Sequence, residues 1–297
     1  MPQSSVTPLA LHGTRVLSLA LNLPGPAALM RCAAMGAQCV KLEPPPRSGH
    51  DSADPMAIYS PASYAVMHQD VRLLQADLKA QAGRELLEQE LAQTDVLLTS
   101  FRPSALAKLG LDWPGLHGRH PQLSLVRIVG AAGEQAELPG HDLTYQAEAG
   151  LIQGTDLPPS LYADMAGALM ASEAVLQAQL LRAASGRGQC LEIALADGAA
   201  WLAQPLQWGL TRPTGDVGGA HAGYRVYACA DGRVAVAALE PHFMTRLSEA
   251  AGLASDADPR STATHQAIAA FIGGQNRAQL QDLALARDIP LHTLSGN

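Results

Sequence analysis

The sequence predicts an α/β fold, in which a doubly wound, mostly parallel sheet is followed by a smaller α+β domain. Over the first 200 residues, short apolar runs alternate with helical segments, which is the pattern of strand–helix–strand units. The composition then changes, because prolines and glycines gather over residues 204–223 before a second, shorter series of elements. We therefore expect a large domain over 1–203, a linker over 204–223 and a small domain over 224–297.

Five short apolar runs supply the predicted strands of the large domain. They are rich in Val, Leu and Ile, which favour a pleated and buried conformation. The runs are Arg15–Leu19, Gln38–Leu42, Val96–Thr99, Leu123–Ile128 and Cys190–Ala194.

Helices are predicted in the intervals between these strands. Gly25-Pro26 begins the first helix and Gly36 ends it, as expected for proline in the first turn and glycine after the last. Gly83–Gln93 places its leucines on one face and its charges on the other. A longer helix is expected over Asp164–Ala184.

The small domain is predicted to begin with a hairpin. Its strands, Tyr224–Ala228 and Val234–Ala238, are joined through a turn that contains Asp231-Gly232. Helices are expected over Pro241–Ala251 and His265–Ile272, and a further strand is expected to begin at Ile289.

Composition and charge exclude several classes of protein. With 47% apolar residues the chain has enough material for a core, which excludes wholesale disorder. Twenty basic residues against 27 acidic ones give a net charge of −7, so we expect no nucleic-acid or anionic-membrane partner. No apolar run approaches 18 residues and no signal peptide is recognisable. The four scattered cysteines form no CxxC pair, and we expect a cytoplasmic protein.

Three candidate functional residues stand at predicted element boundaries, and each has a structural alternative. His141 lies between Gly140 and Asp142 at a loop-to-helix junction, where an imidazole can act as a general base; alternatively, Asp142 caps the helix and His141 is merely exposed. Asp164 is either a helix cap or a carboxylate made reactive by the helix dipole. Glu240 is equally suited to capping the helix that begins at Pro241. No nucleotide-binding, serine-hydrolase or zinc-protease motif is present, and we expect no metal site.

Taken in order, many segments resemble the family III CoA-transferases, the superfamily that includes the 2-methylacyl-CoA racemases. The resemblance covers nearly the whole chain and rests on the ordered series rather than on any single motif. The segments are Leu23–Ala27, Met35–Glu43, Ala76–Lys79, Gly83–Leu86, Thr94–Leu98, Phe101–Pro103, Leu106–Leu111, Pro139–Leu143, Ala163–Gly167, Ser185–Gln189, Tyr224–Tyr227, Ala230–Gly232 and Ala237–Pro241.

The resemblance implies roles for the three candidate residues. The residue matching Asp164 is central to catalysis in this family, and in racemases it pairs with the histidine of a Gly-His-Asp motif, which here contains His141. Transferases often have tyrosine in place of that histidine. Leu239–Phe243 also resembles the racemase version, in which Glu240 would support the site from the small domain.

The resemblance further implies a Rossmann-like, CoA-binding large domain and an interlocked homodimer. No cofactor would be permanently bound, since coenzyme A arrives as part of an acyl-CoA substrate. The expected CoA contacts are Lys41, Arg102 and Gly130 of a glycine-rich loop, together with Arg72. Arg72 is the one basic residue retained where the family has a basic stretch, here His68–Leu73.

Three functions follow from these residues. The first is racemisation of a 2-methylacyl-CoA by two-base proton transfer, in which His141 and Asp164 serve as base and acid on opposite faces of the α-carbon. The second is CoA transfer between carboxylic acids through a thioester on Asp164. The third is an inactive relative that binds CoA or a partner subunit, which the loss of most of the basic stretch would favour.

Overall fold

The computed structural model describes residues 9–46 and 49–295, which form two compact units that meet in sequence between Ala203 and Gln204. The first unit contains a six-stranded parallel sheet and the second a three-stranded antiparallel sheet, each with its own helices. The predicted α/β fold class is confirmed.

The large sheet has the strand order β3-β2-β1-β4-β5-β6, and all neighbouring pairs are parallel. β2 and β3 follow outwards on one side of β1, while β4, β5 and β6 follow outwards on the other side. The chain therefore reverses its direction across the sheet between β1 and β4, which makes this boundary a topological switch point. The strands are β1 (Arg15–Ser18), β2 (Gln38–Glu43), β3 (Val71–Gln75), β4 (Val96–Thr99), β5 (Ser124–Val129) and β6 (Cys190–Ala194).

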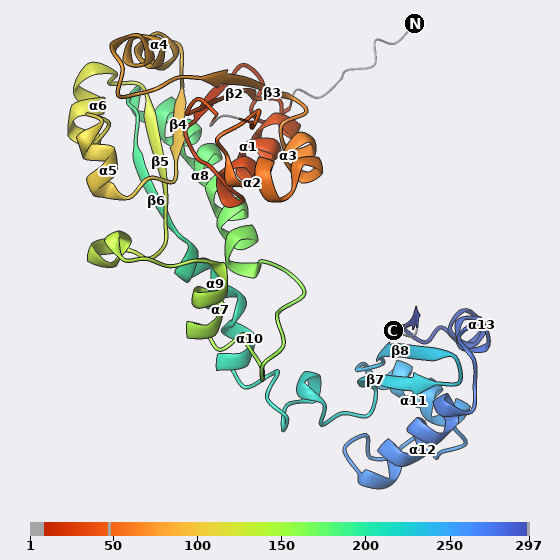
Figure 1. The fold of residues 1–297 in the computed structure, drawn as a ribbon. Helices are drawn as coiled ribbons and strands as arrows, with labels where there is room; N and C mark the ends of the chain where they lie inside the picture. Colours follow the sequence, from red (N-terminus) through yellow and green to blue (C-terminus); the bar gives the residue numbers. More distant parts are fainter. Residues whose placement is uncertain (1–8, 47–48, 296–297) are drawn as a thin grey trace, which may run out of the picture. The chain divides into compact units, whose positions relative to one another are not determined.

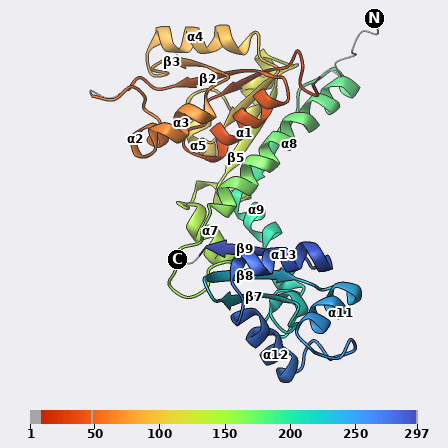
Figure 2. The ribbon, with the colours of Figure 1, turned by 90° about the vertical axis from the view of Figure 1, so that its right-hand side faces the viewer.

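Helices cover both faces of this sheet (Figures 1 and 2). Successive strand residues point to opposite faces, so Val16 and Leu98 join the core under α1 and α8 while Leu17 and Leu97 join the core under α4 to α6. The helices of the first unit are α1 (Pro24–Ala34), α2 (Pro55–Tyr59), α3 (Pro61–Met67), α4 (Gln81–Leu91), α5 (Pro103–Lys108), α6 (Trp113–Arg119), α7 (Asp142–Glu148), α8 (Tyr162–Ser185) and α9 (Leu195–Leu202). The next helix, α10 (Gln204–Gln207), belongs to the second unit.

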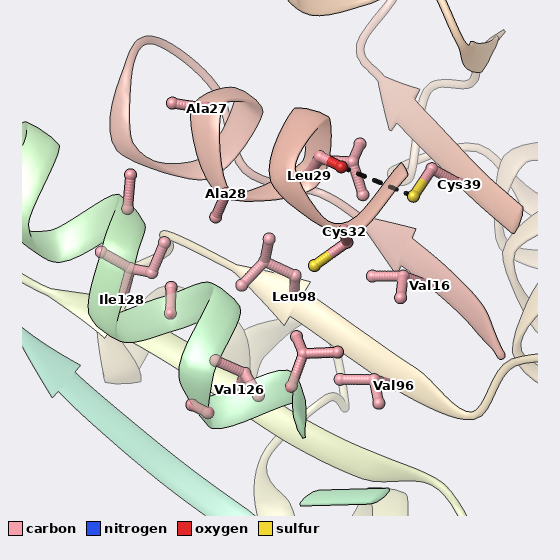
Figure 3. Close-up of a cluster of buried hydrophobic side chains, with 14 of the residues drawn as sticks. Val16, Ala27, Ala28, Leu29, Cys32, Cys39, Val96, Leu98, Val126 and Ile128 are labelled. Atoms are coloured by element: carbon pink, nitrogen blue, oxygen red, sulfur yellow. Dashed lines mark hydrogen bonds between the residues drawn. The ribbon is translucent and has the colours of Figure 1, made fainter. Parts of the chain in front are cut away.

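Figure 3 shows how α1 packs on the sheet. Ala27 and Ala28 are buried against Leu98 and its neighbours, and such small side chains let the helix backbone approach closely. Cys32 belongs to the same core, where burial raises the pKa of its thiol to about 12. The thiol therefore stays protonated and packs as a small apolar group.

The edge strand β3 is absent from the sequence-based prediction. Its residues, VRLLQ, are half-buried or exposed and do not alternate between apolar and polar. It forms because its backbone continues the sheet beside β2, with Arg72 opposite Val40. Pairing to a neighbour thus decided a conformation that the local pattern does not indicate.

The second unit contains β7 (Tyr224–Cys229), β8 (Gly232–Ala237) and β9 (Leu291–Ser295), with the Asp231-Gly232 hairpin as predicted. Its core gathers Val234 and Val236 against three helices. These helices are α11 (Pro241–Ala250), α12 (Thr262–Gly273) and α13 (Arg277–Arg287). Sequence reasoning missed α13, although a capping box between Asn276 and Gln279 marks its start.

Residues 204–223, which the composition predicts to be a linker, belong to this second unit and include α10 and a 3-10 turn at Asp216–Gly218. Throughout the described residues, no helix combines the length and apolar character that crossing a lipid bilayer would require.

Candidate active site

The carboxyl ends of the parallel strands place several loops at one edge of the large sheet. The loop after β1, Arg102 after β4 and Gly130 after β5 all lie there, because parallel strands end on the same side. α8 returns the chain to the start of β6, so its N-terminus lies at this edge too. Ligands of doubly wound sheets bind in the crevice at this edge, at the switch point.

Asp164 lies in the first turn of α8 and is only 9% exposed. Its backbone N–H donates a hydrogen bond of 3.0 Å to Oδ1 of Asp142, the first residue of α7. Burial, and after it the negative charge of Asp142, raises the pKa of Asp164 to about 7. The carboxyl group is therefore divided between its acid and base forms near neutral pH.

Gln146 holds Asp142 from the next turn of α7. Its Nε2 donates to Oδ2 of Asp142 and, over 3.3 Å, to the carbonyl oxygen of Ser160. Gln146 is fully buried, and among the described residues its Oε1 has no hydrogen-bond partner. The Asp142 carboxylate thus has a fixed orientation beside Asp164.

His141 is the N-cap residue of α7 and is exposed. Its backbone is tied down by Thr144, whose Oγ1 accepts from the His141 N–H at 3.0 Å and donates to its carbonyl oxygen at 2.7 Å. The alternatives in which Asp142 or Asp164 caps a helix are wrong: the caps are His141 and Leu161, and both aspartates lie inside their helices and are buried.

A small cavity of about 150 Å³ lies where β4 and β5 end, beside Tyr145 of α7. Arg102, Gly130 and Tyr145 all line it. Gly130 and Gly140 both have to be glycine here, since a Cβ at either position would overlap the Tyr145 hydroxyl group. Burial, and then the charge of Asp164, raises the pKa of Tyr145, so its phenol stays protonated and faces the candidate site.

A second cavity of about 280 Å³ lies at the same edge. Phe101 lines both cavities, and Lys79 lines the second together with apolar residues such as Leu42. Sequence reasoning did not single out Lys79 or Phe101, although both fall within segments that carry the family resemblance. The sequence signal that could have identified them as site residues is their position shortly after the ends of β3 and β4.

Lys41 is fully buried, contrary to what a phosphate ligand requires. Its ammonium group contacts Oδ2 of Asp54 at 2.5 Å, Oε2 of Glu43 at 3.3 Å and Nε2 of His68 at 3.2 Å. These three contacts match the three donors of a lysine ammonium. The expectation that Lys41 contacts a CoA phosphate is not met by this geometry.

Arg72 is not brought to Asp164, and Glu240 belongs to the other unit. Arg72 lies near the amino end of β3, at the opposite edge of the sheet, where its Nη2 donates to Oε2 of Glu90 at 2.6 Å. Glu240 is the exposed N-cap residue of α11 in the second unit. Their predicted roles in CoA binding and catalysis stay predictions. Within residues 9–46 and 49–295, no group of three or more His, Cys, Asp or Glu is arranged to hold a metal ion.

Comparison with known proteins adds a second line of observation. A family model described as CoA-transferase family III matches residues 11–295. The human protein named alpha-methylacyl-CoA racemase is 31% identical over 269 residues, covering 84% of this chain and 67% of that protein. A Chloroflexus aurantiacus protein named succinyl-CoA–D-citramalate CoA-transferase is 29% identical over 302 residues, covering 94% of this chain and 73% of that protein.

Solved structures agree with the sequence comparison. The crystal structure of a hypothetical protein from Mycobacterium tuberculosis superimposes with a TM-score of 0.79 at 25% identity. The match covers 95% of this chain and 84% of that one. The likeness therefore extends over both units and not over the parallel sheet alone.

Proposed function

This chain belongs to CoA-transferase family III, and we propose that it is an acyl-CoA racemase acting on a 2-methylacyl-CoA thioester. The observation that carries the proposal is the buried Asp164, whose pKa of about 7 suits a group that both takes and gives a proton at neutral pH. A Gly-His-Asp sequence runs directly into the helix that contacts it, and Asp142 of that sequence accepts the Asp164 N–H.

In the proposed reaction, His141 and Asp164 act on opposite faces of the α-carbon. One base removes the α-proton, and the electrons of the C–H bond form an enolate whose charge rests on the thioester oxygen. The conjugate acid of the other base then gives a proton to the opposite face, so the configuration inverts and no atom is gained or lost. Backbone N–H groups in the first turn of α8 are the candidate donors to the enolate oxygen.

Coenzyme A would be held along the carboxyl edge of the sheet. The two cavities that share Phe101 lie there, and Arg102 and Lys79 provide positive charge at their walls. Gly130 lines the smaller cavity, which agrees with its expected place near the substrate. The dimer and the cytoplasmic location stay parts of this proposal, and light scattering on the purified protein tests the first of them.

CoA transfer is the second candidate function, and the transferase relative that covers 94% of this chain favours it. In that reaction the ionised Asp164 attacks the thioester carbonyl and expels the CoA thiolate, which leaves a mixed anhydride. The thiolate then attacks the aspartyl carbonyl of the anhydride, releasing the first acid and leaving CoA on Asp164. An acceptor acid takes up the CoA by the same two steps in reverse.

Proton exchange in D₂O separates these functions. We expect the α-hydrogen of a 2-methylacyl-CoA, followed by NMR, to exchange without any acceptor acid, and Asp164→Asn and His141→Ala to abolish the exchange. Asp95→Asn and His120→Gln are matched controls, because both side chains lie at the amino edge of the sheet.

The other outcomes reject the racemase. Asp164-dependent transfer of CoA to an added carboxylic acid, without proton exchange, would establish the transferase. Binding of CoA with neither reaction would identify the chain as an inactive relative.

A further inference from the structure

A cluster of charged residues is buried beside the candidate active site, and the proposed reaction does not use it. Lys41 and Asp54 are both fully buried and contact each other at 2.5 Å. Glu43 and His68 complete the shell around the ammonium group. Burial and the Lys41 charge lower the pKa of His68, so its imidazole is neutral and Nε2 is free to accept from Lys41.

Asp54 connects this cluster to the loop after β1. Oδ1 of Asp54 accepts the backbone N–H of Asn22 at 3.0 Å and that of Met56 at 2.9 Å. The first bond joins the loop after β1 to the cluster, and the second caps the start of α2. Two segments that are separated by 32 residues are therefore held by one carboxylate.

Asn22 has a left-handed backbone, with φ of +67°. Asparagine adopts this conformation more readily than most residues other than glycine, and the hydrogen bond from its backbone N–H to Asp54 holds it in place. Asn22 stands in the loop directly after β1, one of the two loops that flank the switch point.

The connection continues from Asn22 to Tyr59, the last residue of α2. The Tyr59 hydroxyl group donates to Oδ1 of Asn22. Tyr59 also lies within electrostatic reach of the candidate catalytic residue, because the charges of Asp54 and Asp164 contribute, after burial, to raising the pKa of its phenol. Tyr59 is 61% exposed, so it is open to contact by a substrate.

We propose that Lys41 and Asp54 are positioning residues of the active site: through Asp54 they hold Asn22 and the start of α2, and through Asn22 they orient Tyr59 at the carboxyl edge of the sheet. The pair would act on substrate through the loop and the tyrosine, and neither residue would touch CoA. The inference rests on the proposed function for its catalytic consequence, while its structural part stands on the hydrogen bonds alone.

The test compares Asp54→Asn with Asp95→Asn in the full chain. Asp95 is a matched control, since it also accepts a backbone N–H, from Arg15 at 2.7 Å, and pairs with a cation, Arg182, but at the opposite edge of the sheet. An asparagine at position 54 cannot accept from the two backbone N–H groups and from Lys41 at once. Asn22→Gly is a second, milder variant, because glycine adopts positive φ freely and only the acceptor of Tyr59 is lost.

Hydrogen–deuterium exchange is the readout that does not depend on activity. We expect the amides of Asn22 and Met56 to exchange about 10- to 100-fold faster in Asp54→Asn, because a hydrogen bond to a charged group is lost. In Asp54→Asn, the amides elsewhere in the sheet should exchange at the wild-type rate. In Asp95→Asn, the amides of Asn22 and Met56 should also exchange at the wild-type rate. Unchanged amides in Asp54→Asn, or faster exchange everywhere, would overturn the inference.

Steady-state kinetics is the second readout. We expect kcat/KM to fall about 100-fold in Asp54→Asn and about tenfold in Asn22→Gly, with no change in Asp95→Asn. If Asp54→Asn does not fold, Asn22→Gly decides, and a wild-type kcat/KM in that variant would reject the link to Tyr59. If the wild type lacks both reactions, the proposed function fails and the exchange experiment alone decides whether the pair positions the loop.

Discussion

The backbone N–H of Asp164 donates a 3.0 Å hydrogen bond to Oδ1 of Asp142, which brings two buried carboxyl groups from different helices together. The hydrogen bond fixes where α7 meets the first turn of α8. The charge of Asp142 at the same time opposes ionisation of Asp164. Asp142 therefore fixes the position of the candidate catalytic group and adds to the effect of burial on its pKa.

Replacing Asp142 by asparagine tests this coupling. Asp142→Asn keeps an oxygen that accepts the Asp164 N–H but removes the negative charge, so we expect the pKa of Asp164 to fall below about 7. The limb of the pH–rate profile that reports Asp164 should move to lower pH. A ¹³C NMR titration of the aspartate carboxyl groups measures the shift directly, and an unmoved resonance would contradict it.

Stability should depend on pH through Asp164. Its pKa is about 7 in the folded chain and 3.8 in its ordinary state, so the folded chain retains a proton that the unfolded chain releases between these values. The contribution of this group to stability is therefore fully present below about pH 4 and is lost as the pH rises through about 7. We therefore expect the free energy of unfolding of Asp164→Asn, measured relative to that of the wild type, to be about 1–3 kcal/mol higher at pH 8 than at pH 4.

Urea unfolding at several pH values measures this difference. Asp95→Asn is a control that retains Asp164 and changes a carboxylate at the opposite edge of the sheet, so it should show the wild-type trend over this range. A constant difference between Asp164→Asn and wild type would mean that the fold does not raise the pKa of Asp164.

The close approach of Tyr145 to Gly130 gives a third expectation. Gly130→Ala places a Cβ where the Tyr145 hydroxyl group lies, and such overpacking costs about 1–3 kcal/mol. Tyr145→Phe removes the overlapping oxygen, so the double variant should recover most of that loss. Thermal unfolding of the two single variants and the double variant completes the cycle. Additive losses would exclude a direct contact.

Lys41 and Arg72 should differ sharply in their effect on stability. Lys41→Met leaves two buried carboxylates without their cation, and we expect a loss of about 3–5 kcal/mol. Arg72 is half exposed and its partner Glu90 also contacts Arg15, so Arg72→Met should cost about 1 kcal/mol or less. Urea unfolding separates the two, and equal small losses would contradict the assignment of Lys41 to the buried cluster.

Local signals in the sequence were sufficient for most of the architecture. α1 begins at Pro24, one residue before the predicted Gly25-Pro26 start, and Gly36, with φ of +92°, follows its end as predicted. The Asp231-Gly232 turn joins β7 to β8. These features depend on residues that are neighbours in the chain, so the sequence alone carries them.

The family and the central residues of the candidate site were also accessible from sequence. His141 and Asp164 were identified from an ordered series of short segments, and the match over residues 11–295 bears out that family. Their contact through Asp142 was not visible, because it depends on how α7 meets α8.

Only the tertiary structure decided what the charged residues do. Lysine is usually a surface residue, yet Lys41 is completely enclosed by neighbours from β2, from the segment before α2 and from the residue that follows α3. β3 forms at the sheet edge because β2 offers its backbone for pairing. By itself, then, the sequence determined the strands, caps and turns, whose causes are local. Burial, pairing of charges and the proton affinity of Asp164 depend on atoms distant in the chain, and only the fold brings those together.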